Sequence, residues 1–414
     1  MKTAKNYKWE LLALLSAAFF FHQADRAIFG VVLSSIKGEL GLTDGQLGLI
    51  GTSLFATLAV MVPVAGFLGD RLSRKWIITC SLLFWSAATA VTGVARGLLS
   101  LILFRSVATG GGESFYAPSA YSLVAAYHKT TRSLALSVHQ AALYIGVMSS
   151  GFLAGWVAET WGWRSAFYVF GAAGLLLGLV FVFRLRDAPQ TEGRSEAAGM
   201  DRPGFGEVLR VLVRTPSALL ATTGFCAVVF VNNAYVVWAP AFVQHKFSLT
   251  LTQAGGGAMF YHHAAAFAAI MLGGIITDRV VPACPSFRLR LQGVALLLGA
   301  PMIYWLGMTG QLGATWVAMA AFGFFRGLFE ANTHASLFDV VPPRYRATAV
   351  GLMTMTAFLL GSVSPWMMGR LCDVYGKAHG MTVGFTVLAA AYVVGAAAIF
   401  CSLLFTFKQD RVVE

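Results

Sequence analysis

The sequence predicts an all-α membrane protein in which twelve transmembrane helices form two pseudo-symmetric bundles of six. Three observations support this fold class. The composition is far more apolar than that of a soluble domain, basic residues alternate from one predicted loop to the next, and short motifs of the first half recur in the second.

The composition sets the broad class of protein. Of the 414 residues, 57% are hydrophobic and only 12% are charged, and the mean hydropathy is +0.70. Soluble domains carry about 25% charged residues. An ordinary soluble enzyme and a disordered chain are therefore excluded, and a multi-pass membrane protein is favoured.

Twelve apolar segments are long enough to cross a bilayer as helices, which takes about 20 residues each. The first one follows Lys2, Lys5 and Lys8 and continues without a small-residue cleavage site, so we interpret it as a transmembrane helix rather than a signal peptide. The predicted spans are residues 10–33, 46–69, 76–95, 97–120, 131–157, 163–184, 217–243, 252–276, 290–308, 313–337, 347–371 and 380–407.

A polar stretch separates the sixth predicted span from the seventh. It contains Pro189, Pro203 and several glycines among mixed charges, which is typical of a surface linker, and a short amphipathic helix is expected over Phe205–Val213. We therefore expect an N-terminal six-helix bundle over residues 1–184, a cytoplasmic linker over 185–215 and a C-terminal six-helix bundle over 216–414.

The basic residues indicate how the chain is oriented. With the N-terminus in the cytoplasm, 21 of the 30 Lys and Arg residues fall on the cytoplasmic side, 6 fall on the other side, and Arg26, Arg105 and Arg326 lie within helices. This bias follows the positive-inside rule and accounts for the net charge of +12 without a nucleic-acid partner. We expect a protein of the bacterial inner membrane with both termini in the cytoplasm.

Four short motifs recur in the same order about half a chain apart, at offsets of 207, 208, 214 and 214 residues. Such a repeat indicates two copies of a six-helix unit that share one orientation. The matching pairs are Leu42–Gln46 with Leu249–Gln253, Gly66–Arg71 with Gly274–Arg279, Arg132 with Arg346, and Gly155…Gly162 with Gly369…Gly376.

Three predicted helices carry charged residues within the membrane. A charge at the bilayer centre costs about 2.5–3.5 kcal/mol on insertion scales and persists where it has a partner, a cavity or a function. The alternative is that these charges form internal salt bridges that only hold helices together. The residues are His22, Asp25 and Arg26 on one face of the first helix, Arg105 and Glu113 on the fourth, and Arg326, Glu330 and His334 at successive i+4 steps on the tenth.

The loop after the second span reads Gly66-Phe-Leu-Gly-Asp-Arg-Leu-Ser-Arg-Lys75. It resembles the signature loop of the major facilitator superfamily, with Ser73 where that family usually has glycine, and a degraded copy lies at Gly274–Arg279. The resemblance implies a conformational latch at the cytoplasmic face, whereas the residues alone are also compatible with a tight turn flanked by topology anchors. The latch would comprise Gly66, Gly69, Asp70, Arg71, Arg74, Lys75 and Arg132.

A second stretch, Gly110–Ala125, resembles the helix 4 motif of spinster-like transporters, and the anion:cation symporters carry a related version. The Asp25-Arg26 pair matches both groups. The chain departs from the pattern in having Ser114 where Ala is usual. It also places Arg105 eight residues before Glu113, one more than the family leads us to expect.

This resemblance implies a secondary active transporter that works by alternating access, is coupled to protons, and moves a small organic anion or an amphipathic anionic metabolite. Asp25 and Glu113 would bind the proton. The substrate-binding residues would be Arg26, Arg105, Arg326, Glu330, His22, Tyr116, Tyr144, Asn232, Asn233 and His334.

Several alternatives stay open at the sequence level. The chain is alternatively a spinster-like carrier of lysolipids or sphingolipids, or a facilitator that does not use protons, and less readily a transporter-like sensor or an intramembrane enzyme. Because GxxxxGK[ST], HExxH and GxSxG are absent, we expect no ATP-driven transport and no enzyme. We expect no metal and no cofactor, and a monomer in contact with membrane lipid.

Overall fold

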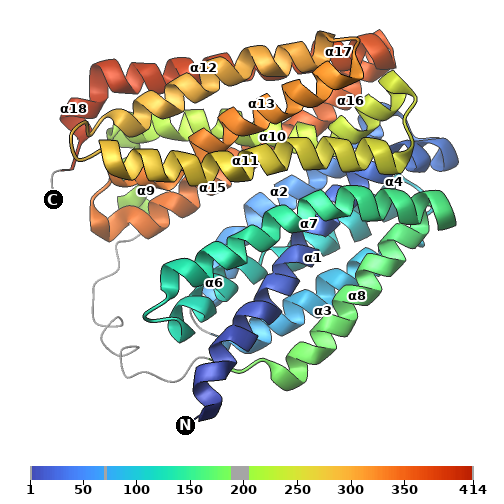
Figure 1. Ribbon diagram of the computed structural model, residues 1–414, viewed down its shortest axis with the longest axis horizontal. Helices are drawn as coiled ribbons and strands as arrows, with labels where there is room; N and C mark the ends of the chain where they lie inside the picture. The colour runs from blue at the N-terminus through green and yellow to red at the C-terminus, as the bar shows by residue number, and fades with distance from the viewer. Residues whose placement is uncertain (1, 70–71, 188–204, 413–414) are drawn as a thin grey trace. The chain divides into compact units, whose positions relative to one another are not determined.

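A computed structural model describes residues 2–69, 72–187 and 205–412, and every regular element within these ranges is helical. Figure 1 shows the helices as long, closely packed rods. Those of the first half are α1 (Lys2–Leu40), α2 (Asp44–Gly69), α3 (Arg74–Thr92), α4 (Leu98–Leu101), the π-helix η1 (Ile102–Ala108), α5 (Thr109–Glu113), α6 (Tyr116–Tyr127), α7 (Arg132–Trp161) and α8 (Trp163–Arg184).

The second half begins with a short helix, α9, at the position where an amphipathic helix was expected. The elements are α9 (Phe205–Arg214), α10 (Pro216–Phe247), α11 (Leu251–Val280), α12 (Phe287–Met308), α13 (Leu312–Glu330), α14 (Thr333–Phe338), the 3-10 helix η3 (Pro343–Tyr345), α15 (Arg346–Gly361), α16 (Val363–Tyr375), α17 (Lys377–Cys401), the π-helix η4 (Ser402–Thr406) and α18 (Phe407–Asp410).

Eleven helical segments among the described residues are long and apolar enough to cross a membrane. Each coincides with one of the predicted spans. The remaining prediction, residues 97–120, corresponds to α4, η1, α5 and α6, which follow one another over residues 98–127 as four shorter pieces. Twelve transmembrane passes are consistent with this arrangement.

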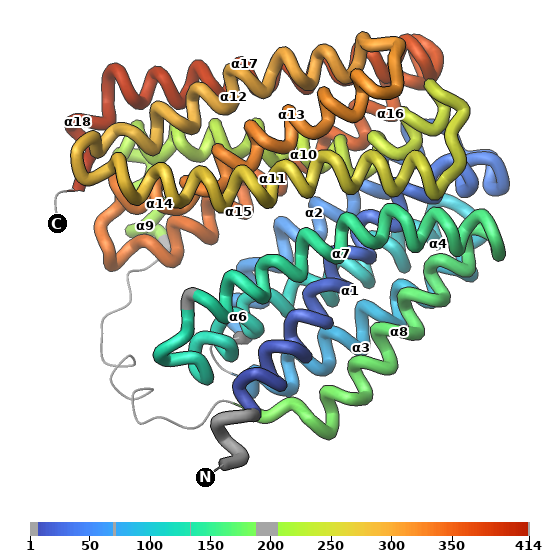
Figure 2. Tube along the Cα trace, viewed as in Figure 1, coloured from blue at the N-terminus to red at the C-terminus, as the bar shows by residue number. Residues whose placement is uncertain are grey.

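The chain divides into two compact units. The first comprises Met1–Gln190, Tyr235–Phe260 and Pro365–Asp373, and the second comprises Thr191–Ala234, Tyr261–Ser364 and Val374–Glu414. In the first unit α1 lies against α7, and α3 lies against α8. In the second, α12 packs between α13 and α17 (Figure 2). The boundaries predicted at residues 184 and 216 stay a prediction, since residues 188–204 of that linker lie outside the described ranges.

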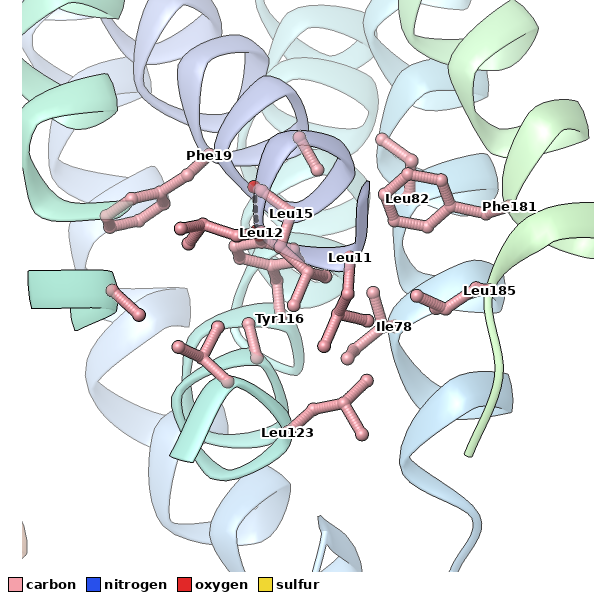
Figure 3. Packing of buried hydrophobic residues seen from close by; sticks show 14 of the residues in the cluster. Leu11, Leu12, Leu15, Phe19, Ile78, Leu82, Tyr116, Leu123, Phe181 and Leu185 are labelled. Atoms are coloured by element: carbon pink, nitrogen blue, oxygen red, sulfur yellow. Dashed lines mark hydrogen bonds between the residues drawn. The ribbon is translucent and has the colours of Figure 1, made fainter. Parts of the chain in front are cut away.

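A hydrophobic cluster fixes the start of α1 within the first unit. Leucines of α1, among them Leu11 and Leu15, meet Ile78 and Leu82 of α3 and Phe181 of α8 (Figure 3). Tyr116 of α6 lies in the same cluster and donates a hydrogen bond of 2.5 Å to the Leu15 carbonyl oxygen. This packing holds α1, α3 and α6 together next to the charged residues of α1.

The motif repeat noticed in the sequence corresponds to repeated local structure. Thr43 and Gln46 form a reciprocal capping box at the start of α2, with N–H···O distances of 2.9 and 3.2 Å. Thr250 and Gln253 form the same box before α11, at 3.3 and 3.2 Å. The two copies of the repeat therefore begin their second helix in the same way.

Candidate functional site

The charged residues of the first half converge in a buried cluster, which we call the first-half cluster: Asp25 and Arg26 of α1, Arg105 of η1 and Glu113 at the end of α5. Asp25 is 2% exposed, and Arg105 and Glu113 are each 1% exposed. Residues of the first and fourth predicted spans are thus brought together.

Each charge in this cluster has a specific contact. The Arg26 Nε donates to Glu113 Oε2 at 2.8 Å, forming a salt bridge in which the Glu113 side chain is fully buried. The Arg105 Nη2 donates to the main-chain carbonyl oxygen of Asp25 at 2.7 Å, and Thr89 of α3 donates to Asp25 Oδ2 at 3.0 Å. The two arginines therefore have different partners, one a carboxylate and the other a carbonyl.

The π-helix η1 explains the unusual spacing between Arg105 and Glu113. In a regular α-helix, eight residues would place the two side chains about 80° apart around the axis. A π-turn accommodates one extra residue without changing the register of the flanking helix, and such turns occur frequently at functional sites. Since η1 spans Ile102–Ala108, it absorbs the additional residue, and Arg105 reaches the Asp25 carbonyl.

Several polar atoms in the cluster have no hydrogen-bond partner within the part of the chain that the structure describes. They are Asp25 Oδ1, Glu113 Oε1, and Arg105 Nε and Nη1. Buried polar groups are normally paired, and leaving one unpaired costs about 1–3 kcal/mol. One free oxygen on each carboxylate and two free donors on a guanidinium suit the binding of protons and of an anionic group.

His22 links the cluster to its surroundings. Its Nε2 lies 3.1 Å from the Glu113 carbonyl oxygen, which can only accept, so Nε2 carries the proton. Its Nδ1 then accepts from the Gln23 side chain at 3.0 Å. His22 is thereby a neutral residue that fixes the end of α5 on which Glu113 lies.

Two predicted substrate residues of the first half lie in packed surroundings. Tyr116 is fully buried in the hydrophobic cluster of α1, α3 and α6, and its hydroxyl also lies 3.1 Å from His139 Nε2. Tyr144 of α7 is 3% exposed.

The second half has a smaller charged group, the second-half cluster, formed by Arg326 and Glu330 of α13 and His262 of α11. The Arg326 Nε and Nη2 donate to Glu330 Oε1 at 3.0 and 2.7 Å. The Arg326 Nη1 lies 3.0 Å from His262 Nε2. Because a guanidinium can only donate, His262 accepts at Nε2 and is neutral.

Close helix packing brings His262 within reach of Arg326. Gly323 and Gly327 form a G-x-x-x-G pair on α13, and each lies directly against the backbone of α11. A Cβ atom on Gly323 would meet the His262 carbonyl oxygen, and one on Gly327 would meet the Ala266 carbonyl oxygen. Small residues at this spacing allow two helices to approach closely. His262 was absent from the predicted site, and this glycine pair on either side of Arg326 was the available signal.

The polar ladder predicted over Arg326, Glu330 and His334 is interrupted in the structure. Helix α13 ends at Glu330 and α14 begins at Thr333, and Asn332 between them donates to Thr277 Oγ1 at 3.1 Å. His334 therefore starts a new short helix and is exposed. The regular i+4 geometry holds for Arg326 and Glu330 but does not extend to His334.

The two asparagines of α10 lie in the second unit. Asn233 is 1% exposed, and its Nδ2 has no hydrogen-bond partner among the described residues, as is also true of Asn232 Oδ1. A Cβ atom on Gly361 of α15 would lie 3.1 Å from Asn233 Nδ2, so this amide faces α15.

The predicted latch is described only in part. Asp70 and Arg71 lie outside the described residues. Gly69 ends α2, Arg74 and Lys75 begin α3, and Arg132 begins α7. Among the described residues, no atom outside the neighbouring backbone of α2 lies within 4 Å of the position that a Gly66 Cβ would occupy. Ser73 is the N-cap of α3 and accepts from the Trp76 N–H at 3.4 Å, which gives a local reason for serine where the family usually has glycine.

No group of three or more His, Cys, Asp and Glu residues within the described ranges is arranged to hold a metal ion.

Comparison with known proteins identifies the family. The sequence profile of the Major Facilitator Superfamily matches residues 15–365. The chain is 28% identical to protein spinster homolog 1 of Bos taurus over 387 residues, covering 88% of this chain and 72% of that protein. It is 26% identical to the probable sulfoacetate transporter SauU of Cupriavidus necator over 429 residues, covering 98% and 96% of the two chains. It is 27% identical to the sphingosine-1-phosphate transporter SPNS2 of Mus musculus over 440 residues, covering 96% and 77%.

Solved structures show the same fold. A bacterial homologue of the human lysosomal transporter spinster, in an inward-facing and unoccupied conformation, superposes with a TM-score of 0.86 at 21% identity, covering 98% of this chain and 99% of that one. A D-xylose-proton symporter superposes with a TM-score of 0.78 at 13% identity, covering 98% and 100%. The chain therefore belongs to the Major Facilitator Superfamily, in its spinster-like branch, and is a multi-pass membrane transporter of a small molecule rather than an enzyme.

Proposed function

We propose that this transporter moves a small organic anion or an amphipathic anionic metabolite together with protons, by alternating access. The observation that carries the proposal is the first-half cluster, in which two buried carboxylates and two guanidinium groups leave four polar atoms without hydrogen-bond partners among the described residues. In this proposal Asp25 and Glu113 bind the proton, and Arg26 and Arg105 contact the anion.

The charges of the cluster explain why the two binding events are coupled. Asp25, Glu113, Arg26 and Arg105 sum to zero when both carboxylates are ionised. Binding an anion at Arg105 or Arg26 withdraws positive charge from the carboxylates and favours their protonated forms. Protonation in turn leaves the arginines uncompensated and strengthens anion binding, so each ligand promotes the other by the same free energy.

The second-half cluster supplies a further cation for the substrate. The Arg326 guanidinium is a cation within a membrane-spanning helix, held by Glu330 and His262. We assign Arg326 and Glu330, with His22, Tyr116, Tyr144, Asn232, Asn233 and His334, to substrate contact. The same proposal places both termini in the cytoplasm of a bacterial inner membrane and treats the protein as a monomer surrounded by lipid, with residues 66–75 and Arg132 as the cytoplasmic latch.

A lipid substrate is the second candidate. It is favoured by the similarity to a sphingosine-1-phosphate transporter, whose named cargo combines an anionic head with an apolar chain. The same arginines would bind the phosphate in that case, so both candidates share the anion site and differ in the rest of the substrate.

The test uses purified protein in liposomes with an inwardly directed proton gradient. Sulfoacetate and sphingosine-1-phosphate serve as the two substrate probes. We expect Asp25→Asn and Glu113→Gln to abolish gradient-driven uptake of the transported probe while sparing its exchange across the membrane. Glu39→Gln is the matched control, since Glu39 pairs with Arg164 at the end of α1. Gradient-driven uptake that survives both substitutions would contradict the proton assignment.

A further inference from the structure

Two carboxylates occupy equivalent positions in the two repeats. Glu159 lies near the end of α7, and Asp373 lies near the end of α16, 214 residues later. Each is preceded four residues earlier by a glycine, Gly155 or Gly369, and followed three residues later by Gly162 or Gly376. Gly162 and Gly376 have φ values of 84° and 78°, which L-residues rarely adopt, so the helices end there in the same way.

Asp373 contacts the first turn of α2, which belongs to the other repeat. Its Oδ1 accepts from the Asp44 N–H and its Oδ2 from the Gly45 N–H, both at 2.9 Å. Gly369 permits this contact, because a Cβ atom there would collide with the Asp44 carbonyl group. All of these residues belong to the first compact unit.

Glu159 makes the corresponding contact with the first turn of α11. Its Oε1 accepts from the Thr252 N–H at 2.8 Å, and its Oε2 accepts from the Thr252 hydroxyl at 2.7 Å. Gly155 lies against the backbone of Leu251 and Thr252, where a Cβ atom would stand 2.6 Å from the Thr252 Cα. These residues also lie within the first unit.

The capping boxes explain why a carboxylate is needed at both places. The first turn of a helix has free N–H groups and a partial positive charge. In α2 and α11 the box threonine takes the third N–H of the helix, that of Gln46 or Gln253. The N–H groups just before it donate instead to the opposite repeat: those of Asp44 and Gly45 to Asp373, and that of Thr252 to Glu159. Each first turn is therefore completed by a residue of the other repeat.

At α2 each acidic residue also has a cation nearby. Asp44 pairs with Lys37 at 2.5 Å, and Asp373 lies 3.6 Å from Arg370. The hydrogen bonds of Asp373 to the N–H groups of the helix terminus are additional to that ion pair.

We infer that Glu159 and Asp373 are gate residues of the transport cycle, which hold one end of the carrier closed by capping helices of the opposite repeat. Alternating access requires the two repeats to separate at each end in turn. At the end where α1 leads into α2, both carboxylate caps must break for that end to open. This assignment does not depend on the substrate or on proton coupling.

The proposal is tested by measuring how far apart the repeats stand at this end. Spin labels are placed at Gly38 of the first repeat and Tyr375 of the second, both exposed, in a cysteine-free background in lipid nanodiscs. Electron–electron double resonance then gives the ratio of long to short distances. An interaction of a carboxylate with a helix N-terminus is worth up to a factor of about 5 in an equilibrium constant. We therefore expect Glu159→Ala or Asp373→Ala to raise the ratio about fivefold each.

Because both caps act on one equilibrium, the double variant is expected to raise the ratio about 25-fold, the product of the single effects. Glu159→Gln and Asp373→Asn retain an acceptor oxygen and are expected to shift the ratio less than the alanine variants. Glu39→Gln is the control, because Glu39 accepts hydrogen bonds from Trp163 and Arg164, which belong to its own repeat. An unchanged ratio in the double variant, or an equal change in Glu39→Gln, would overturn the assignment.

Discussion

The two buried charge clusters occupy related places in a duplicated fold but are built differently. The first-half cluster joins α1, α3, η1 and α5, and its Glu113 side chain is fully buried. The second-half cluster is centred on one i,i+4 pair of α13, and its Glu330 side chain is 21% exposed. The end caps of α2 and α11, in contrast, have stayed alike in both repeats. The duplication has thus kept the contacts to which we assign a gate role and changed the charges that we propose bind the substrate.

The largest expected difference in unfolding free energy comes from the different burial of the Arg26–Glu113 and Arg326–Glu330 salt bridges. Arg26→Leu leaves Glu113 buried without its cation, and breaking a buried pair in this way costs about 3–5 kcal/mol of unfolding free energy. Arg326→Leu leaves the partly exposed Glu330 and is expected to cost about 1 kcal/mol. Thermal unfolding in detergent measures both. Adding Glu113→Gln to Arg26→Leu should recover most of the lost unfolding free energy. If the two arginine substitutions lower the unfolding free energy equally, the proposed difference between the clusters is contradicted.

The next largest change in unfolding free energy is expected where α13 packs closely on α11. Gly323→Ala places a methyl group against the His262 carbonyl, and such overpacking costs about 1–3 kcal/mol. Gly351→Ala in α15 is the matched control, because within the described part of the chain no atom beyond its own helix backbone lies within 4 Å of its Cβ position. We expect that control to be neutral or to raise the unfolding free energy by about 0.5–1 kcal/mol. A Gly323→Ala protein as stable as Gly351→Ala would contradict the role of the glycine pair.

Substitutions of His262 test whether its hydrogen bond positions the Arg326 side chain. His262→Leu removes the acceptor for Arg326 Nη1 and is expected to cost about 1 kcal/mol of unfolding free energy. His262→Gln offers an oxygen in place of Nε2 and should cost less. His263→Leu, at the neighbouring position, is the comparison variant for the measurement. A glutamine variant no better than leucine would mean that the hydrogen bond does not position Arg326.

The smallest change in unfolding free energy is expected when the π-helix η1 is shortened by one residue. Val107 lies in η1 between Arg105 and Glu113 and is 46% exposed. Deleting it should convert η1 into regular α-helix and place the two residues seven apart, with the flanking segments still in register. We expect the unfolding free energy to change by less than about 1 kcal/mol, and transport to persist. Loss of the fold would show that η1 is not a tolerated one-residue insertion.

The sequence predicted the helices well, because length and apolarity decide whether a segment can cross a bilayer. It also singled out Asp25, Arg26, Arg105 and Glu113, together with Arg326 and Glu330, since charges within spans are costly and therefore conspicuous. It did not show that the first four meet in one cluster. It did not predict η1, because a π-turn has no composition of its own and appears only as an eight-residue spacing.

Long-range partners were the other part that sequence reasoning did not reach. Glu159 and Asp373 lie at helix ends where acidic residues are unremarkable, and only their contacts with α11 and α2 distinguish them. The same holds for His262, whose proximity to Arg326 depends on the packing of two helices. The i+4 ladder expected over Arg326, Glu330 and His334 is not one continuous helix, since α13 ends at Glu330 and α14 begins at Thr333.

The central claim, that the first-half carboxylates take up the proton, is tested most directly by infrared spectroscopy of the carboxyl groups. Difference spectra between about pH 8 and pH 5 are recorded for the protein in nanodiscs and for three variants, using the absorption of protonated carboxyl groups in apolar surroundings. We predict that part of this absorption is lost in Asp25→Asn and in Glu113→Gln and is retained in Glu330→Gln. Absorption that is unchanged in both first-half variants, or that is lost in Glu330→Gln alone, would contradict the account.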